Sequence, residues 1–257
     1  MEVLFILTFA LFGLAVGSFL NVVADRLPEG ESIVYPPSHC STCGHALATG
    51  DLIPVVSYIS LRGRCRYCGA PIPKRLPIIE AVTGALFAFL YLRYGLILQT
   101  VVFAFYFCIF LTILVTDFEH RIIPNKIVYP SAVIALVISS YTPGIGIVNA
   151  LIGGGFGFIL FILIAVFSFL VFKKEGMGIG DIKLITLIGI VTGFPMVIVA
   201  IYLAIISGGL VAIFLVVTKL KKMKDLIAYG VFLSLATMAT LLWGRDILNW
   251  YMRFYTY

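Results

Sequence analysis

The chain has 257 residues, of which 61% are hydrophobic and only 12% are charged, and its net charge at pH 7 is +6. Soluble domains carry about 25% charged residues, so this composition excludes an ordinary soluble globular protein. Repeated apolar stretches indicate instead an all-α polytopic membrane protein, since helices satisfy their own backbone polar groups in lipid.

Eight apolar segments are predicted as transmembrane helices. In chain order they cover residues 3–24, 78–98, 100–116, 127–141, 145–172, 182–194, 196–218 and 227–244. The first lacks the basic start and the small-residue cleavage site of a signal peptide, so we expect a retained helix. The chain then divides into a first helix (1–24), a polar insert (25–77) and a larger transmembrane domain (78–257). Gly13-x₃-Gly17 and Gly153-x₃-Gly157 predict close helix packing.

The basic residues predict the orientation of these helices. If the loops alternate between the two sides of the membrane, 15 of the 18 lysines and arginines fall on one side. Cytosolic loops carry such an excess, so this side is expected to be cytosolic and both termini to face outward. We expect the positive charge to meet anionic lipid headgroups, and we expect no nucleic-acid partner.

The insert holds four of the five cysteines, in two C-x-x-C-G turns. An aliphatic residue, Leu47 or Ile72, follows each turn at the same distance, which indicates a short internal duplication. Two such turns supply enough thiolates for a closed tetrahedral zinc site. We therefore predict a cytosolic zinc-knuckle domain in which structural zinc replaces a hydrophobic core. Its predicted ligands are Cys40, Cys43, Cys65 and Cys68.

Two disulfides or a dithiol redox pair are the alternatives for these cysteines. A reducing cytosol disfavours disulfides, and a redox C-x-x-C usually stands alone beside a βαβ unit. His39 and His45 flank the first turn and are expected to be exposed loop residues, not ligands. Cys108 lies alone in the third apolar segment, where we expect it to pack in the interior.

Asp117 and Asp181 lie where apolar segments meet the predicted cytosolic face. Ionisable residues in such places are costly and are usually functional. Two close carboxyls share a proton, so one can activate water while the other protonates or polarises a scissile carbonyl. Structural interpretations exist too: Asp181 as a helix N-cap, and Asp117 as a partner of Arg121 one turn later. We predict a catalytic pair. A helix N-terminus favours an ionised Asp181, which leaves Asp117 as the proton holder, but a coupled pair titrates as a unit, so which acid holds the proton stays open.

These motifs resemble the type IV prepilin peptidase family, which combines a leader peptidase with an N-methyltransferase in bacterial pilus and type II secretion systems. The resemblance covers nearly the whole chain. It rests on Gly17-Ser18-Phe19-Leu20-Asn21-Val22-Val23, the paired cysteine turns, Asp117 with Arg121-Ile122-Ile123-Pro124-Asn125, and Glu175 to Leu184 with its G-x-G-D sequence.

Two segments depart from the family pattern. Asn125 stands where many members have Asp, so Asn125 is not expected to be an essential acid. The segment Ile227 to Leu233 resembles the late segment of the family, although many members have Pro-Phe-Gly-Pro there. We expect this second difference to affect the late helix and not the two acids.

The resemblance implies a function. Asp117 and Asp181 would be the aspartyl protease pair that removes the basic leader of a prepilin or pseudopilin after Gly. The enzyme would then methylate the new N-terminal amine with S-adenosylmethionine, whose binding residues the sequence does not indicate. Gly63 and Glu80 are candidates to assist the methylation. The expected location is the bacterial cytoplasmic (inner) membrane, in a multi-pass arrangement with membrane lipids around it and the active site at the cytosolic face.

Two other functions stay open. The protein could be a transporter or ion channel whose border acids bind cations, although the middles of the apolar segments lack the further charged residues that this function needs. It could also be a non-catalytic assembly factor whose zinc domain docks a cytosolic partner. The identity of the substrate and the oligomeric state stay open as well.

Overall fold

A computed structural model of the chain describes residues 1–142, 145–173, 178–219 and 228–253. Within these ranges the regular structure is helical, with two isolated β-bridges and no strand. Residues 175–177 of the second acid motif, and Ile227 of the last predicted segment, lie outside the described residues. The chain forms two compact units, Met1–Cys108 and Ile109–Tyr257, and each is described by itself.

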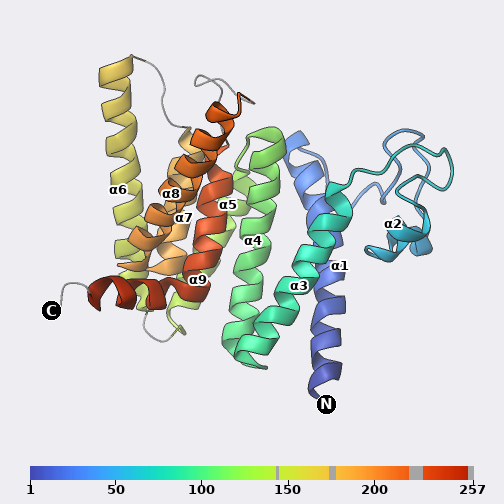
Figure 1. Cartoon of the computed structure of the whole chain (residues 1–257), viewed down its shortest axis with the longest axis horizontal. Coiled ribbons are helices and arrows are strands. Elements are labelled where there is room, and N and C mark those ends of the chain that lie inside the picture. Colours follow the sequence, from blue (N-terminus) through green and yellow to red (C-terminus); the bar gives the residue numbers. More distant parts are fainter. Residues whose placement is uncertain (143–144, 174–177, 220–227, 254–257) are drawn as a thin grey trace. The chain divides into compact units, whose positions relative to one another are not determined.

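The first unit is a helical hairpin with the cysteine insert between its arms (Figure 1). It contains α1 (Glu2–Glu29), the 3₁₀ turn η1 (Thr49–Leu52), α2 (Val56–Ser60), α3 (Arg75–Tyr94) and the start of α4 (Leu98–His120). The first helix is longer than predicted, because it continues through Pro28 and ends at the left-handed Gly30.

Close backbone contact joins α1 to α3. A Cβ on Gly13 would lie 2.9 Å from the Cα of Gly84, and one on Gly17 would lie 2.8 Å from the Cα of Glu80. Asn21, one turn after Gly17, donates its side-chain amide to the Leu76 carbonyl at 3.0 Å. The predicted close packing at Gly13 and Gly17 is confirmed, and it accounts for part of the N-terminal motif.

The second unit contains the rest of α4, α5 (Asn125–Ser139), α6 (Gly146–Phe172), α7 (Ile179–Thr192), α8 (Met196–Val217) and α9 (Tyr229–Arg253). Helix α7 lies at its centre, contacts α5, α6, α8 and α9, and buries Leu184, Ile185 and Ile188 completely. Gly153 of α6 meets the backbone of Gly189 in α7, which confirms the predicted glycine packing here too. The last part of α9 bends away from the rest of that helix (Figure 1).

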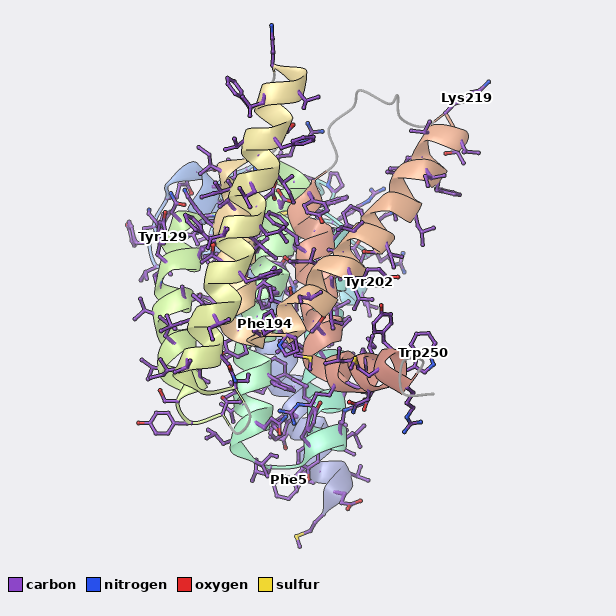
Figure 2. The ribbon with its side chains drawn as sticks, turned by 90° about the vertical axis from the view of Figure 1, so that its left-hand side faces the viewer. Phe5, Tyr129, Phe194, Tyr202, Lys219 and Trp250 are labelled. Atoms are coloured by element: carbon purple, nitrogen blue, oxygen red, sulfur yellow. The ribbon has the colours of Figure 1, made fainter. Side chains whose placement is uncertain are left out.

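Each of the eight predicted apolar segments is a helix, which confirms the all-α fold. Six of them, α1, α3, α4, α6, α8 and α9, are long and apolar enough to cross a membrane. The remaining two are shorter, with 15 residues in α5 and 14 in α7. Large apolar side chains cover the outer faces of α6 and α8: Phe167 is 65% exposed, and Tyr202, which points outward in Figure 2, is 62% exposed. The protein is therefore a multi-pass membrane protein.

Candidate active site and metal centre

Asp117 lies in the last turn of α4 and is only 6% exposed. Helix α4 ends three residues later, and Arg121 follows with a left-handed φ of 55°. The Asp117 carboxylate accepts backbone N–H groups from the first turn of α9: Val231 donates to Oδ2 at 3.1 Å, and Gly230 also donates. Arg121 adds a charge attraction but no close ion pair. The i+4 pairing with Arg121 is thus not what holds this acid.

Asp181 is the third residue of α7, and the helix begins three residues before the predicted start of the segment. The N-cap is Gly178, so the interpretation of Asp181 as the N-cap is wrong. The Asp181 carboxylate instead reaches back to the Gly178 N–H, a contact typical of the third helical position. Asp181 lies outside the six candidate membrane spans. Burial, and secondly the nearby charge of Asp117, raise the pKa of Asp181 to about 6.

Ile123, in the connection between α4 and α5, joins the two acid-bearing regions. A Cβ on Gly180 would lie 3.3 Å from the Cβ of Ile123, and a Cβ on Gly230 would lie 3.2 Å from its Cδ1. The starts of α7 and α9 therefore pack against the same side chain. This packing brings Asp117 and Asp181 into electrostatic range, although they are 64 residues apart in sequence.

Two backbone groups of this site were missed by the sequence analysis. The difference from Pro-Phe-Gly-Pro was expected to leave the acids unaffected, and that expectation is wrong, because the Val231 N–H contacts Asp117. The signal in the sequence was Gly230, a glycine at the start of an apolar helix and inside a segment that resembles the family, since such a glycine can allow a close contact. A sequence cannot indicate which side chain such a helix start would contact.

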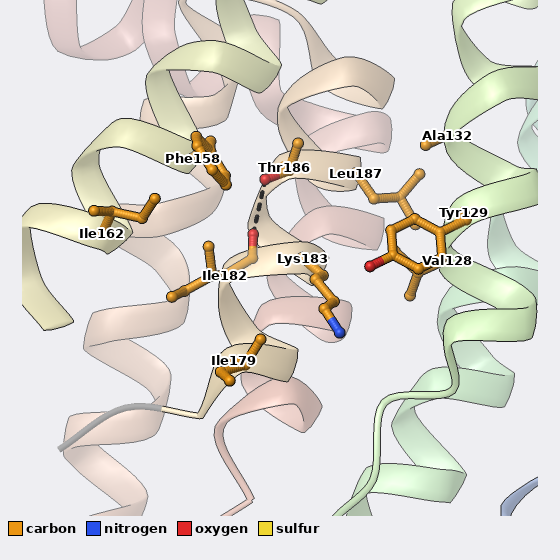
Figure 3. Close-up of a pocket in the computed structure, with 10 residues that line it drawn as sticks. All are labelled: Val128, Tyr129, Ala132, Phe158, Ile162, Ile179, Ile182, Lys183, Thr186 and Leu187. Carbon is orange, nitrogen blue, oxygen red and sulfur yellow. Dashed lines mark hydrogen bonds between the residues drawn. The ribbon is translucent and has the colours of Figure 1, made fainter. Parts of the chain in front are cut away.

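An apolar groove of about 360 Å³ lies between α5, α6 and α7 (Figure 3). Lys183 is its charged residue: its Nζ donates to Asn125 Oδ1 at 3.0 Å and lies 5.7 Å from the centroid of the Tyr129 ring. Asn125, which replaces the Asp of many family members, therefore joins α5 to α7. Neither Asp117 nor Asp181 lines this groove, whose lining residues are Val128, Tyr129, Ala132, Phe158, Ile162, Ile179, Ile182, Lys183, Thr186 and Leu187.

The two cysteine turns have the same backbone structure. Cys40 and Cys65 each accept the N–H of the glycine four residues later, at 2.8 and 2.9 Å, and both glycines are left-handed, with φ of 69° and 72°. The aliphatic residues also correspond: Leu47 donates to the Ser38 carbonyl and Ile72 to the Gly63 carbonyl, both at 2.8 Å. The geometry thus repeats the duplication that the sequence indicates.

The four cysteine sulfurs lie within 4.8 Å of one another. Zn–S bonds of about 2.3 Å give sulfur–sulfur edges of about 3.8 Å in a tetrahedron, and the Cys40 and Cys68 sulfurs are 3.8 Å apart. The pKa shifts of the thiols differ in direction: backbone N–H groups of Cys43 and Thr42 lower the pKa of Cys40 to about 6, whereas the pKa of Cys68, despite a backbone hydrogen bond at Ala70, is raised by burial and the neighbouring thiols. The fit to zinc thus depends on the arrangement of the sulfurs. These residues therefore fit a closed zinc site.

Neither histidine of the insert belongs to this cluster. The His39 ring makes a hydrogen bond of 3.0 Å with the Pro37 carbonyl. The His45 ring packs against the Tyr67 ring at a tilt of 35°, with centroids 3.7 Å apart. Both side chains are exposed, which confirms the expectation of exposed loop residues.

Glu80, a candidate for assisting methylation, holds the insert on α3. Its carboxylate is buried and accepts the Val55 N–H at 2.7 Å. Val55 is a β-branched residue with a left-handed φ of 61°, a conformation that needs support from its surroundings. Gly63, the other candidate, packs against the ring of Tyr58.

These features define a polytopic helical membrane protein with a pair of aspartates at helix ends and a four-cysteine cluster in a polar insert. The chain belongs to the type IV leader peptidase family. The model of that family matches residues 103–213, and a model described as the bacterial peptidase A24 N-terminal domain matches residues 11–94. The resemblance stated from the motifs is confirmed.

Curated relatives cover nearly the whole chain. A prepilin leader peptidase/N-methyltransferase of Pseudomonas aeruginosa is 30% identical over 97% of this chain and 94% of its own length. A protein of the same name from Bacillus subtilis is 30% identical over 95% of this chain and 96% of its own length. One from Myxococcus xanthus is 36% identical over 72% of this chain and 56% of its own length. No solved structure matches the chain.

Proposed function

We propose that this protein is a membrane aspartyl endopeptidase that cleaves prepilins or pseudopilins after the glycine of their basic leader, and that it also methylates the new N-terminus. Its relatives with the corresponding name align along almost the full length of both chains. The observation that supports the peptidase most directly is the pair of carboxyls, Asp117 and Asp181, held at the ends of packed helices.

The arrangement suits hydrolysis by two carboxyls that share one proton. The two acids lie close enough for the charge of one to oppose ionisation of the other. One ionised carboxylate can then take a proton from water while the protonated partner polarises the scissile carbonyl. We place this site at the cytosolic face of the bacterial inner membrane, because the basic loops are expected on that side. A substrate could keep its basic leader in the cytosol and its apolar helix in the lipid.

The methylation would use S-adenosylmethionine, which supplies an electrophilic methyl group for the new N-terminal amine. We assign no residues to its binding. The four cysteines would hold zinc, and this closed site has no open position for substrate, so its role is to fold the insert.

Cleavage of a prepilin by the purified protein tests the peptidase proposal. Asp117→Asn and Asp181→Asn should each lower kcat by at least about 10³-fold, as happens when one member of a catalytic unit is removed. Glu119→Gln, which changes an acid two residues from Asp117, serves as the control and should stay within a few-fold of the wild type. Wild-type rates in both Asn variants would exclude this function and favour an assembly factor.

A further inference from the structure

Helix α9 begins against one of the two proposed catalytic acids. The Val231 N–H lies 3.1 Å from Asp117 Oδ2, and the Gly230 backbone also donates to this carboxyl. First-turn N–H groups have no partner inside their own helix, and they carry the positive end of the helix dipole. Two such donors stabilise the ionised carboxylate relative to the neutral acid.

Gly230 allows this close approach. A Cβ on this residue would lie 2.7 Å from Oδ2 and 3.0 Å from Cγ of Asp117. Any other residue at position 230 would push the carboxyl away from the start of α9. The start of α9 can therefore contact Asp117 only because residue 230 has no side chain.

The surroundings of Asp181 favour its charge less. Its carboxylate has one backbone donor among its described contacts, the Gly178 N–H, and it experiences the negative charge of Asp117. Among the described residues, the other titratable groups that act on the pair are Arg121, which attracts Asp117 and directly follows α4, and Tyr229 of α9, which interacts with Asp181. The repulsion between the two carboxyls acts on both alike, so the difference lies in their other partners: Asp117 has two N–H donors and a nearby cation, while Asp181 has one described donor.

We propose that the start of α9 fixes Asp117 as the ionised member of the pair, so that Asp117 is the general base and Asp181 the proton donor. Gly230 and the Val231 N–H act through Asp117 and are positioning groups. The proposal rests on the proposed peptidase function and adds the direction of proton transfer within it.

The reaction then follows in two steps. The Asp117 carboxylate takes a proton from water as the water oxygen bonds to the scissile carbonyl carbon, and Asp181 gives its proton to the carbonyl oxygen. Asp117 next passes its proton to the amide nitrogen as the C–N bond breaks. Asp181 recovers a proton from one hydroxyl of the gem-diol as the carboxyl product forms. Both acids end in their starting states, and water is consumed.

Position 231 allows one donor to be removed cleanly. When the glycine of Pro-Phe-Gly-Pro is aligned with Gly230, the second proline falls at position 231, and proline has no N–H. Val231→Pro deletes the donor in the first turn of α9, where proline costs no intrahelical hydrogen bond. Val231→Ala trims the side chain and keeps the N–H, and is the matched control.

The experiment measures kcat and KM for prepilin cleavage by the full-length protein across pH. A general base must be ionised, so it sets the acidic limb of the profile. Loss of one hydrogen bond to a carboxylate is expected to raise its pKa, and with it the acidic limb of Val231→Pro, by about one pH unit. Val231→Ala keeps the N–H, so its acidic limb should stay at the wild-type pH whatever its kcat. The KM of Val231→Pro should change less than about three-fold, because the contact is to Asp117 and not to substrate.

Two results would overturn the proposal. The first is an active Val231→Pro variant whose pH–rate profile has an unchanged acidic limb, which would show that the N–H has no such role. The second is a shift of the basic limb alone, which would make Asp117 the proton donor. If Val231→Pro does not fold, Gly230→Ala provides the same test. Its control is Gly209→Ala, a glycine of α8 with no atom near the added Cβ. Cleavage by Asp117→Asn at the wild-type rate would instead contradict the peptidase function itself, so the two failures can be told apart.

Discussion

The cysteine cluster of the first unit and the aspartate pair of the second are built in different ways. The four cysteines fall within 29 consecutive residues, and each turn is fixed by hydrogen bonds within itself. The aspartates are 64 residues apart, and each is held by the start of a helix. A local site of this kind depends on a few turns, whereas the aspartate pair depends on the packing of α4, α7 and α9.

The largest expected effect separates the two proposed activities. Asp181→Asn should lower prepilin cleavage by at least about 10³-fold, because the proton of the pair is lost. Methylation of a substrate that has already been cleaved should stay within about three-fold, if the methylation site is independent of the pair. Parallel assays of both activities on one preparation measure this ratio. Equal loss of both activities would contradict the separation.

Substitution of a proposed zinc ligand is expected to remove the metal and leave prepilin cleavage nearly unchanged. Cys65→Ser should lower bound zinc from about one per chain to a small fraction, because a structural zinc site needs four ligands. Cys108→Ser, outside the cluster, should keep its zinc. Elemental analysis reports the metal, and the cleavage assay should show a few-fold change at most. Less than one zinc per wild-type chain would exclude the tetrathiolate site.

The pH dependence of cleavage should reflect the raised pKa of Asp181. With this pKa at about 6, the carboxyl is protonated below pH 6 and loses its proton as the pH rises through that value. If Asp181 is the proton donor, kcat falls about ten-fold for each pH unit on the basic side. Asp181→Asn should abolish the reaction and not just move this limb. A rate that rises steadily from pH 6 to 8 would contradict this role.

A smaller effect tests the packing that assembles the pair. Gly153→Ala forces a methyl group into the backbone of α7 at Gly189, and should destabilise the second unit by about 1–3 kcal/mol. Gly155→Ala places the same methyl group on the same helix with no atom near it. Thermal unfolding in detergent compares the two variants. A melting temperature for Gly153→Ala equal to that of Gly155→Ala would show that the contact between Gly153 and Gly189 does not stabilise the second unit.

The same contrast explains how much the sequence could predict. The clustering of the four cysteines and the duplication of their turns were predictable, because turn geometry follows from C-x-x-C-G itself. The helices were predictable from their apolar length, and Asp117 and Asp181 from the cost of placing acids at their ends. The contact of Val231 with Asp117 was not predictable, because it joins residues 114 positions apart through tertiary packing. The start of α7 was placed too late, since Ile179 and Gly180 read as part of a glycine-rich turn.

The central claim is that Asp117 and Asp181 act as one catalytic unit, and a double-mutant cycle tests it most directly. Prepilin cleavage would be measured for Asp117→Asn, Asp181→Asn and the double variant, with zinc content and melting temperature confirming folding. Residues that act as a unit are strongly non-additive, so the double variant should be about as slow as either single variant. Losses that multiply, or a single variant with wild-type activity, would contradict the claim.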